Sequence, residues 1–81
     1  MRGAVLRPNP TNGVAQIVFR ELPASDMQVI VADAAGRVVK TLPTTQQAVV
    51  RLDCSELPGG IYMVHFRSGA ESGVRRLAVV K

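Results

Sequence analysis

The stretch LPGGIYMVHF, residues 57–66, carries the clearest structural signal in the chain. A proline and two glycines precede an alternating run in which Tyr62, Val64 and Phe66 fall on one face. Alternation with a period of two is typical of a β-strand that buries one face, and glycine and proline mark the turn before it. We therefore expect a strand over residues 61–67 whose core face holds these three side chains.

Six further segments show short runs of strand-forming residues, and we expect strands at residues 4–7, 14–20, 27–33, 37–41, 47–53 and 74–80. The side chains in phase with a buried face are Ala15, Ile17 and Phe19, then Met27, Val29 and Val31, and then Val50 and Leu52. We expect Pro43 to end the fourth strand, and SGAESG, residues 68–73, to form a loose hairpin loop. Seven short strands, with a turn roughly every eight to twelve residues, predict a β-sandwich.

The LPGGIY step resembles the corner at which immunoglobulin-like sandwiches cross between sheets. In those folds a tyrosine near the start of the sixth strand donates a hydrogen bond to upstream backbone, and Tyr62 has that position. The segment DAAGR, residues 33–37, predicts a hairpin in which Asp33 accepts bonds from the turn and Gly36 takes a positive φ. The expected fold class is all-β, a seven-stranded immunoglobulin-like antiparallel β-sandwich.

The composition predicts one small folded domain over residues 1–81. Hydrophobic residues make up 47% of the chain, and the longest apolar runs are far below the roughly 20 residues that span a bilayer. No charged segment followed by a long apolar one begins the chain, so we expect no signal peptide in this fragment. The net charge of +4 comes from scattered basic residues without interleaved aromatic residues, which does not favour a nucleic-acid partner.

No residue pattern predicts catalysis. Cys54, the single cysteine, has no matched base and is expected to be a packing residue, and His65, the single histidine, cannot build a zinc site alone. Asp33 and Asp53 are expected to be turn residues. LPGG precedes a strand, whereas a phosphate-binding loop precedes a helix. We expect no enzyme, no cofactor, no metal site and no small-molecule substrate.

Two features leave alternatives open. The segment RPNPTNG, residues 7–13, is a turn in which Pro8 and Pro10 end the first strand and Asn12-Gly13 reverses the chain, or it is a motif that another protein recognises. Four apolar residues out of phase with the core are either local packing or part of a docking surface on an outer sheet face. These are Val18, Ile30, Ile61 and Met63.

Four markers occur in order: PNPTNG, DAAGR, LPGGIYMVHF and a basic, apolar last strand, VRRLAVVK. In this order and spacing the chain, from about residue 6 to residue 81, resembles the type IX secretion system C-terminal sorting domain of type A, also called the Por secretion tail. The family pattern falls on Pro8, Asn9, Pro10 and Gly13, on Asp33, Gly36 and Arg37, and on Leu57, Gly60 and Tyr62. The last strand, with Arg75, Arg76, Leu77, Val79, Val80 and Lys81, is the candidate for recognition by the translocon. Arg75-Arg76 stands where the family often has lysines.

The resemblance implies a non-catalytic signal at the C-terminal end of a larger cargo protein of Bacteroidetes. The cargo would cross the inner membrane by the general secretory route and then be directed to the type IX outer-membrane translocon and its shuttle and sortase components. A sortase-like protease would remove the tail, and the cargo would reach the cell surface or be released. The cleavage site is expected upstream of the domain and outside this chain.

The alternative functions are an immunoglobulin-like adhesion or carbohydrate-binding module of a surface protein, and a structural spacer domain. A sugar-binding module would show exposed aromatic residues, and the chain has only three aromatic residues in all. An exposed edge strand would also allow the isolated domain to form a homodimer.

Overall fold

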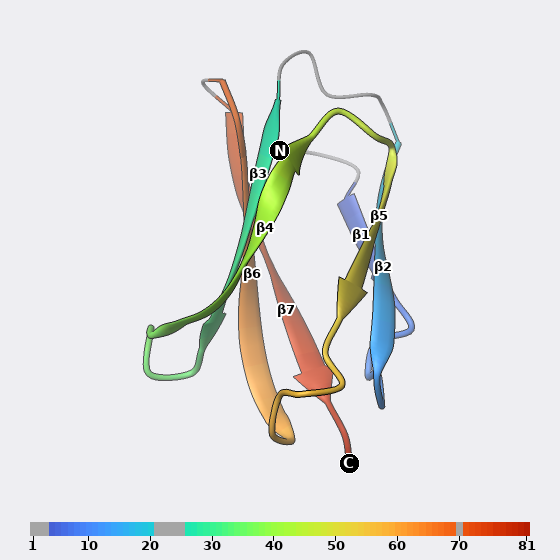
Figure 1. Cartoon of the computed structure of the whole chain (residues 1–81), viewed down its shortest axis with the longest axis vertical. Coiled ribbons are helices and arrows are strands. Elements are labelled where there is room, and N and C mark those ends of the chain that lie inside the picture. Colours follow the sequence, from blue (N-terminus) through green and yellow to red (C-terminus); the bar gives the residue numbers. More distant parts are fainter. Residues whose placement is uncertain (1–3, 21–25, 70) are drawn as a thin grey trace.

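Seven strands in two antiparallel sheets form the fold in a computed structural model that describes residues 4–20, 26–69 and 71–81 (Figure 1). Their bounds are β1 Ala4–Arg7, β2 Val14–Phe19, β3 Met27–Asp33, β4 Val38–Thr45, β5 Val49–Asp53, β6 Gly60–Ser68 and β7 Glu71–Val79. One sheet has the order β1-β2-β5, and the other has the order β4-β3-β6-β7. The predicted all-β, immunoglobulin-like sandwich is confirmed.

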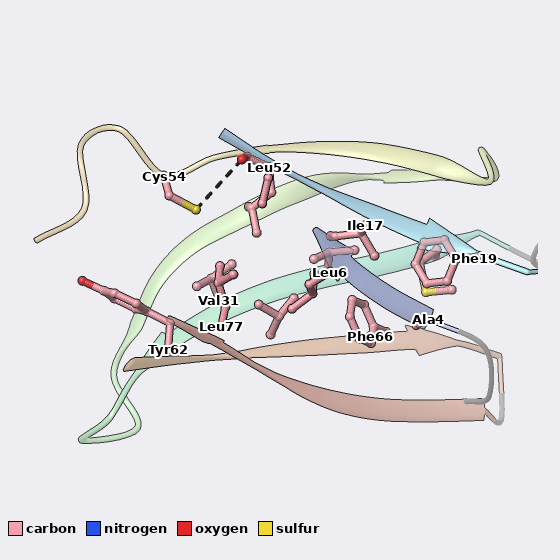
Figure 2. Packing of buried hydrophobic residues seen from close by; sticks show 14 of the residues in the cluster. Ala4, Leu6, Ile17, Phe19, Val31, Leu52, Cys54, Tyr62, Phe66 and Leu77 are labelled. Atoms are coloured by element: carbon pink, nitrogen blue, oxygen red, sulfur yellow. Dashed lines mark hydrogen bonds between the residues drawn. The ribbon is translucent and has the colours of Figure 1, made fainter. Parts of the chain in front are cut away.

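The core lies between the two sheets and follows the predicted alternation. Every strand except β4 contributes buried apolar side chains, and Figure 2 shows Phe19 and Phe66 at one end of this cluster and Tyr62 at the other. Phe19 and Phe66 meet edge to face, with ring centroids 5.6 Å apart and an interplanar angle of 85°. Such aromatic pairs add about 0.5–1.5 kcal/mol beyond the burial of their area. The core cluster is Ala4, Leu6, Ala15, Ile17, Phe19, Met27, Val29, Val31, Leu52, Cys54, Tyr62, Val64, Phe66, Leu77 and Val79.

Two predicted boundaries are wrong by three residues or more, and the others agree to within two residues. β4 does not end at Pro43 but continues to Thr45, because β4 is the edge strand of its sheet and Pro43 falls where the β3–β4 register shifts. A proline at an edge or a bulge removes no ladder hydrogen bond. The predicted SGAESG loop is mostly strand, since Ser68 pairs with Glu71 and Arg67 with Ser72. Gly69, which follows β6, has a left-handed φ of 59°, a conformation that favours glycine.

Candidate functional site

Asn9 and Thr11, in the PNPT part of RPNPTNG, lie along the outer edge of β7. Asn9 Nδ2 donates to the carbonyl of Arg76 at 2.9 Å, and Asn9 Oδ1 accepts from the backbone N–H of Ala78 at 3.0 Å. The Thr11 N–H donates to the Ala78 carbonyl at 2.9 Å, and the Thr11 carbonyl accepts from the Val80 N–H at 2.8 Å. Thr11 therefore forms a parallel β-bridge with Val79 of β7. The side-chain amide of Asn9 bonds to the same strand edge nearer the start of β7, as a backbone peptide group would.

This contact explains the alternation of proline with polar residues. An uncovered strand edge exposes backbone N–H and C=O groups, which invites pairing with another chain. Pro8 and Pro10 have no N–H to offer, so the donors come from the Asn9 side chain and the Thr11 backbone. Both X–Pro bonds of the segment are cis. The sequence predicted a turn or a recognition motif here, and the structure adds an edge contact with β7 that neither interpretation contained.

The predicted reversal into β2 is present, and Thr11 builds it. The Gly13 N–H donates to Thr11 Oγ1 at 3.2 Å, and the Thr11 hydroxyl donates to the Val14 carbonyl at 3.1 Å. The Gly13 carbonyl accepts from the Cys54 N–H at 2.7 Å, which ties the turn to the end of β5. Thr11 is only 2% exposed, so this polar residue is part of the interior at the edge of the sandwich.

The LPGGIY step closes the same end of the molecule. The Tyr62 hydroxyl donates to the Pro58 carbonyl at 2.6 Å, the bond to upstream backbone that the sequence predicted. Leu57 is half-buried against the core, and its N–H donates to the Cys54 carbonyl at 3.0 Å. Gly59 passes close to β7, because a Cβ there would lie 3.4 Å from the carbonyl oxygen of Val79. The corner and the last strand are therefore packed together.

Lys81 joins the end of the chain to the β5–β6 connection. Its Nζ donates to the carbonyls of Ser55 at 2.9 Å and Cys54 at 3.3 Å, 26 and 27 residues away in sequence. Its stem passes Gly59, where a Cβ would lie 3.6 Å from Lys81 Cγ. Both carbonyls follow β5, outside the sheet ladders. The Cys54 carbonyl also accepts from the Leu57 N–H, whereas the ammonium group satisfies the Ser55 carbonyl, which would otherwise need water.

The remaining residues of the candidate recognition strand do not share one face. Leu77 and Val79 are in the core, 0% and 3% exposed, so a partner cannot touch their side chains while the sandwich is folded. Arg75 is half-buried and donates to the Ala4 carbonyl at 3.1 Å and to the Val74 carbonyl at 2.9 Å. Arg76 is exposed on the outer face of the sheet. One side of the predicted strand therefore packs into the sandwich, and the other side is accessible to a partner.

The DAAGR hairpin between β3 and β4 has the predicted turn chemistry. Asp33 Oδ1 accepts from the N–H groups of Ala35 at 3.0 Å and Arg37 at 2.9 Å, and Gly36 has a φ of 87°. The guanidinium of Arg37 lies 3.2 Å from Asp33 Oδ2. The Arg37 N–H bond, followed by the Ala35 N–H and the Arg37 guanidinium, outweighs desolvation and lowers the pKa of Asp33.

The four markers meet in one row across the four-stranded sheet. Asp33 pairs with Tyr62, Tyr62 pairs with Leu77, and Asn9 binds the backbone on either side of Leu77. In Figure 1 the β3–β4 and β5–β6 connections and the end of β7 lie at the same end of the molecule. The row links segments that are up to 69 residues apart in sequence.

A family model described as the secretion system C-terminal sorting domain matches residues 6–80. The chain belongs to this family, the type IX secretion C-terminal sorting domains. No curated protein matches the chain. The sorting domain is therefore a signal for type IX secretion, which in Bacteroidetes directs proteins to the cell surface or out of the cell, and it interacts with the type IX secretion machinery. Domains of this family are typically non-catalytic.

Cys54 and Asp53 have structural roles in the sorting domain. Cys54 is 0% exposed and burial raises the pKa of its thiol, as suits a packing residue. Asp53 accepts from the Ser55 hydroxyl at 2.6 Å and from the Ser55 N–H at 2.9 Å, and these two bonds lower its pKa. Over the ranges that the structure describes, no group of three metal-ligating side chains occurs, and no helix could span a membrane.

Four residues that pack or bond near the end of β7 could not be identified from the sequence. Thr11 resembles any turn threonine, and its burial follows only from its pairing with β7. In the sequence Gly59 looks like any glycine of a turn, although β7 passes beside it. The acceptors at Cys54 and Ser55 are backbone carbonyls, which every residue has, so only their position near Lys81 distinguishes them.

Proposed function

We propose that this sorting domain is the C-terminal part of a larger cargo protein and that the secretion machinery recognises it as a folded sandwich. The proposal rests on the row of motif residues around β7. Asn9, Thr11 and Lys81 spend their hydrogen bonds on the backbone of the same domain, so their role is to hold β7 in place. The motif residues would then contribute to recognition indirectly, by keeping the recognised surface folded.

The finer steps of the export route form a second part of the proposal. We propose that the cargo crosses the inner membrane by the general secretory route, that the sorting domain then engages the outer-membrane translocon and its shuttle components, and that a sortase-like protease removes the domain. These steps require no catalytic group in the domain itself. The cleavage would fall upstream of β1, in the segment that joins cargo and sandwich.

The experiment is a fusion of this domain to an exported reporter in a host that has the type IX system. The wild-type fusion should appear at the cell surface or in the medium, and a fusion without residues 77–81 should not, because Leu77 and Val79 are core residues. A circular dichroism melt of the truncated domain tells loss of fold from loss of contact. Periplasmic retention of the wild-type fusion, equal to that of the reporter alone, would refute the proposal.

A second pair of variants tests whether the motif acts through the fold. Asn9→Ala removes the two bonds to β7, and Ile17→Val removes one methylene from a fully buried side chain at a cost of about 0.5–1.5 kcal/mol without touching that edge. Both fusions should lose export in step with their loss of stability. If Asn9→Ala stops export while the domain stays folded and Ile17→Val does not, the machinery contacts the motif directly.

The alternative of a carbohydrate-binding module gains no support from the surface. Sugar-binding sites commonly stack a ring of the ligand on an exposed aromatic side chain. All three aromatic residues of the chain, Phe19, Tyr62 and Phe66, are buried. No Phe, Tyr or Trp ring is therefore available on either outer sheet face.

A further inference from the structure

The outer face of the four-stranded sheet is apolar and positively charged. Strand pairing places the outward residues in rows: Gln28, Arg67 and Ser72; then Ile30, His65 and Val74; then Ala32, Met63 and Arg76; then Ile61 and Ala78. Val38 extends the third row through its pairing with Ala32. Val38, Val74 and Ile61 are 56%, 42% and 37% exposed, so large apolar side chains lie open on this face. Three of the four out-of-phase residues predicted from the sequence belong to it, and Val18 lies on the other sheet.

Two guanidinium groups on this face lack a partner. Within the described part of the chain, neither Arg67 nor Arg76 makes a side-chain hydrogen bond or an ion pair, although both are exposed. No described Asp or Glu occurs in the outward rows. Asp26, which precedes β3, accepts a hydrogen bond from Gln46 Nε2 at 2.9 Å. Among the residues that the structure describes, no carboxylate therefore pairs with these two guanidinium groups.

A pocket of about 320 Å3 lies at one end of this face. Ile30 and Val74 line it with apolar surface, and Arg67, Gln28, Ser72 and His65 add polar groups. The side chain of a glutamate or aspartate suits such a pocket. Its aliphatic part would contact the apolar surface, and its carboxylate would lie beside the guanidinium of Arg67. Arg76 pairs with Met63, which lies four residues before Arg67 on β6. The two arginines are therefore about 13 Å apart along the strand direction at the usual rise per residue.

The three-stranded sheet offers an internal comparison. Its outer face has a row of three valines, Val5, Val18 and Val49, and a row that contains Arg7 and Arg51. There, however, the guanidinium of Arg51 lies 4.0 Å from a carboxylate of the same strand, Asp53. Within the described residues the Arg7 guanidinium makes no hydrogen bond or ion pair, so the four-stranded face differs in having two unpaired guanidinium groups, with a pocket beside one of them.

We propose that the outer face of the four-stranded sheet docks an acidic segment of a partner protein, with one carboxylate in the pocket beside Arg67 and a second on Arg76. Apolar side chains between the two acids would cover Ile30 and Val74, and those beyond the second acid would cover Ile61. This inference rests on the proposed function, since it states which surface the secretion machinery contacts. Flat apolar patches flanked by charge are typical of docking sites, and complementary charge chiefly sets the rate and the specificity of such encounters.

The test is a pair of charge reversals in the reporter fusion. Arg67→Glu with Arg76→Glu reverses the proposed face, and Arg7→Glu with Arg51→Glu makes the same change in net charge on the opposite face. The first variant should lower the rate of export about tenfold or more and the control should change it little, while both keep the wild-type circular dichroism melt. Equal export of the two variants would overturn the inference and leave the proposed function standing. Failure of the wild-type fusion would instead refute the proposed function.

The nature of the partner is tested by a photo-reactive side chain. A benzophenone amino acid in place of His65 should cross-link to a polypeptide segment with at least two Asp or Glu residues, and the charge reversal should abolish that product. Reversing the charge of those acids to Lys should restore export of the Arg67→Glu, Arg76→Glu variant. Cross-links only from the matched position Gln16, on the other face, would overturn the inference. Binding of the isolated domain to vesicles of phosphatidylcholine and phosphatidylglycerol, lost on charge reversal, would replace the protein partner with an anionic membrane surface.

Discussion

Replacing Asn9 by alanine is the sharpest test of how β7 is held. The substitution removes a donor 2.9 Å from the Arg76 carbonyl and an acceptor 3.0 Å from the Ala78 N–H. A hydrogen bond contributes about 0.5–1.5 kcal/mol net, and because both bonds are exposed, water can replace part of each, so we expect a loss of about 1–2 kcal/mol. For a domain of this size that corresponds to a fall in Tm of roughly 5–15 °C.

The assay combines urea unfolding with hydrogen exchange. Asn12→Ala is the matched control, since Asn12 is exposed, stands in the same segment and makes no side-chain hydrogen bond within the described residues. Exchange at the Ala78 N–H should accelerate in Asn9→Ala, whereas the Val80 N–H, bonded to the Thr11 carbonyl, should stay more protected. If Asn9→Ala unfolds at the same urea concentration as Asn12→Ala and Ala78 exchanges at the wild-type rate, Asn9 does not hold β7.

Two further predictions concern the corner and the hairpin. Tyr62→Phe should cost about 1–2 kcal/mol in urea unfolding, because it deletes the hydroxyl that donates to the Pro58 carbonyl at 2.6 Å and keeps the buried ring; wild-type stability would show that water satisfies that carbonyl equally well. Folding lowers the pKa of Asp33 below its ordinary value of 3.8, so its charge contributes stability that is complete above pH 3.8 and is lost as the pH falls through the lower folded-state pKa. Asp33→Asn keeps the turn and removes the charge, so thermal melts should show wild type more stable than Asp33→Asn near neutral pH and a gap that narrows below pH 3.8. A gap independent of pH would mean that the charge contributes nothing.

Local chemistry made most of the fold predictable. The alternation of residues 61–67, the Asp33–Gly36 turn and the Tyr62 bond to upstream backbone all depend on neighbours within a few residues. The errors arose where a neighbour in space overrode a local signal. Pro43 stays in a strand because β4 is an edge, and residues 71–73 join β7 because β6 pairs with them.

The candidate site divides in the same way. The sequence alone determined the strands, the turns and the order of the four markers, since period-two patterns and turn residues act over short distances. Only the tertiary structure decided that Asn9 and Thr11 cover the edge of β7 and that Lys81 reaches the carbonyls after β5. It also decided that Arg75 and Arg76 point to opposite sides of the sheet. The physical reason is that these contacts join residues 26 to 69 positions apart through backbone groups, which every residue has and no sequence pattern marks.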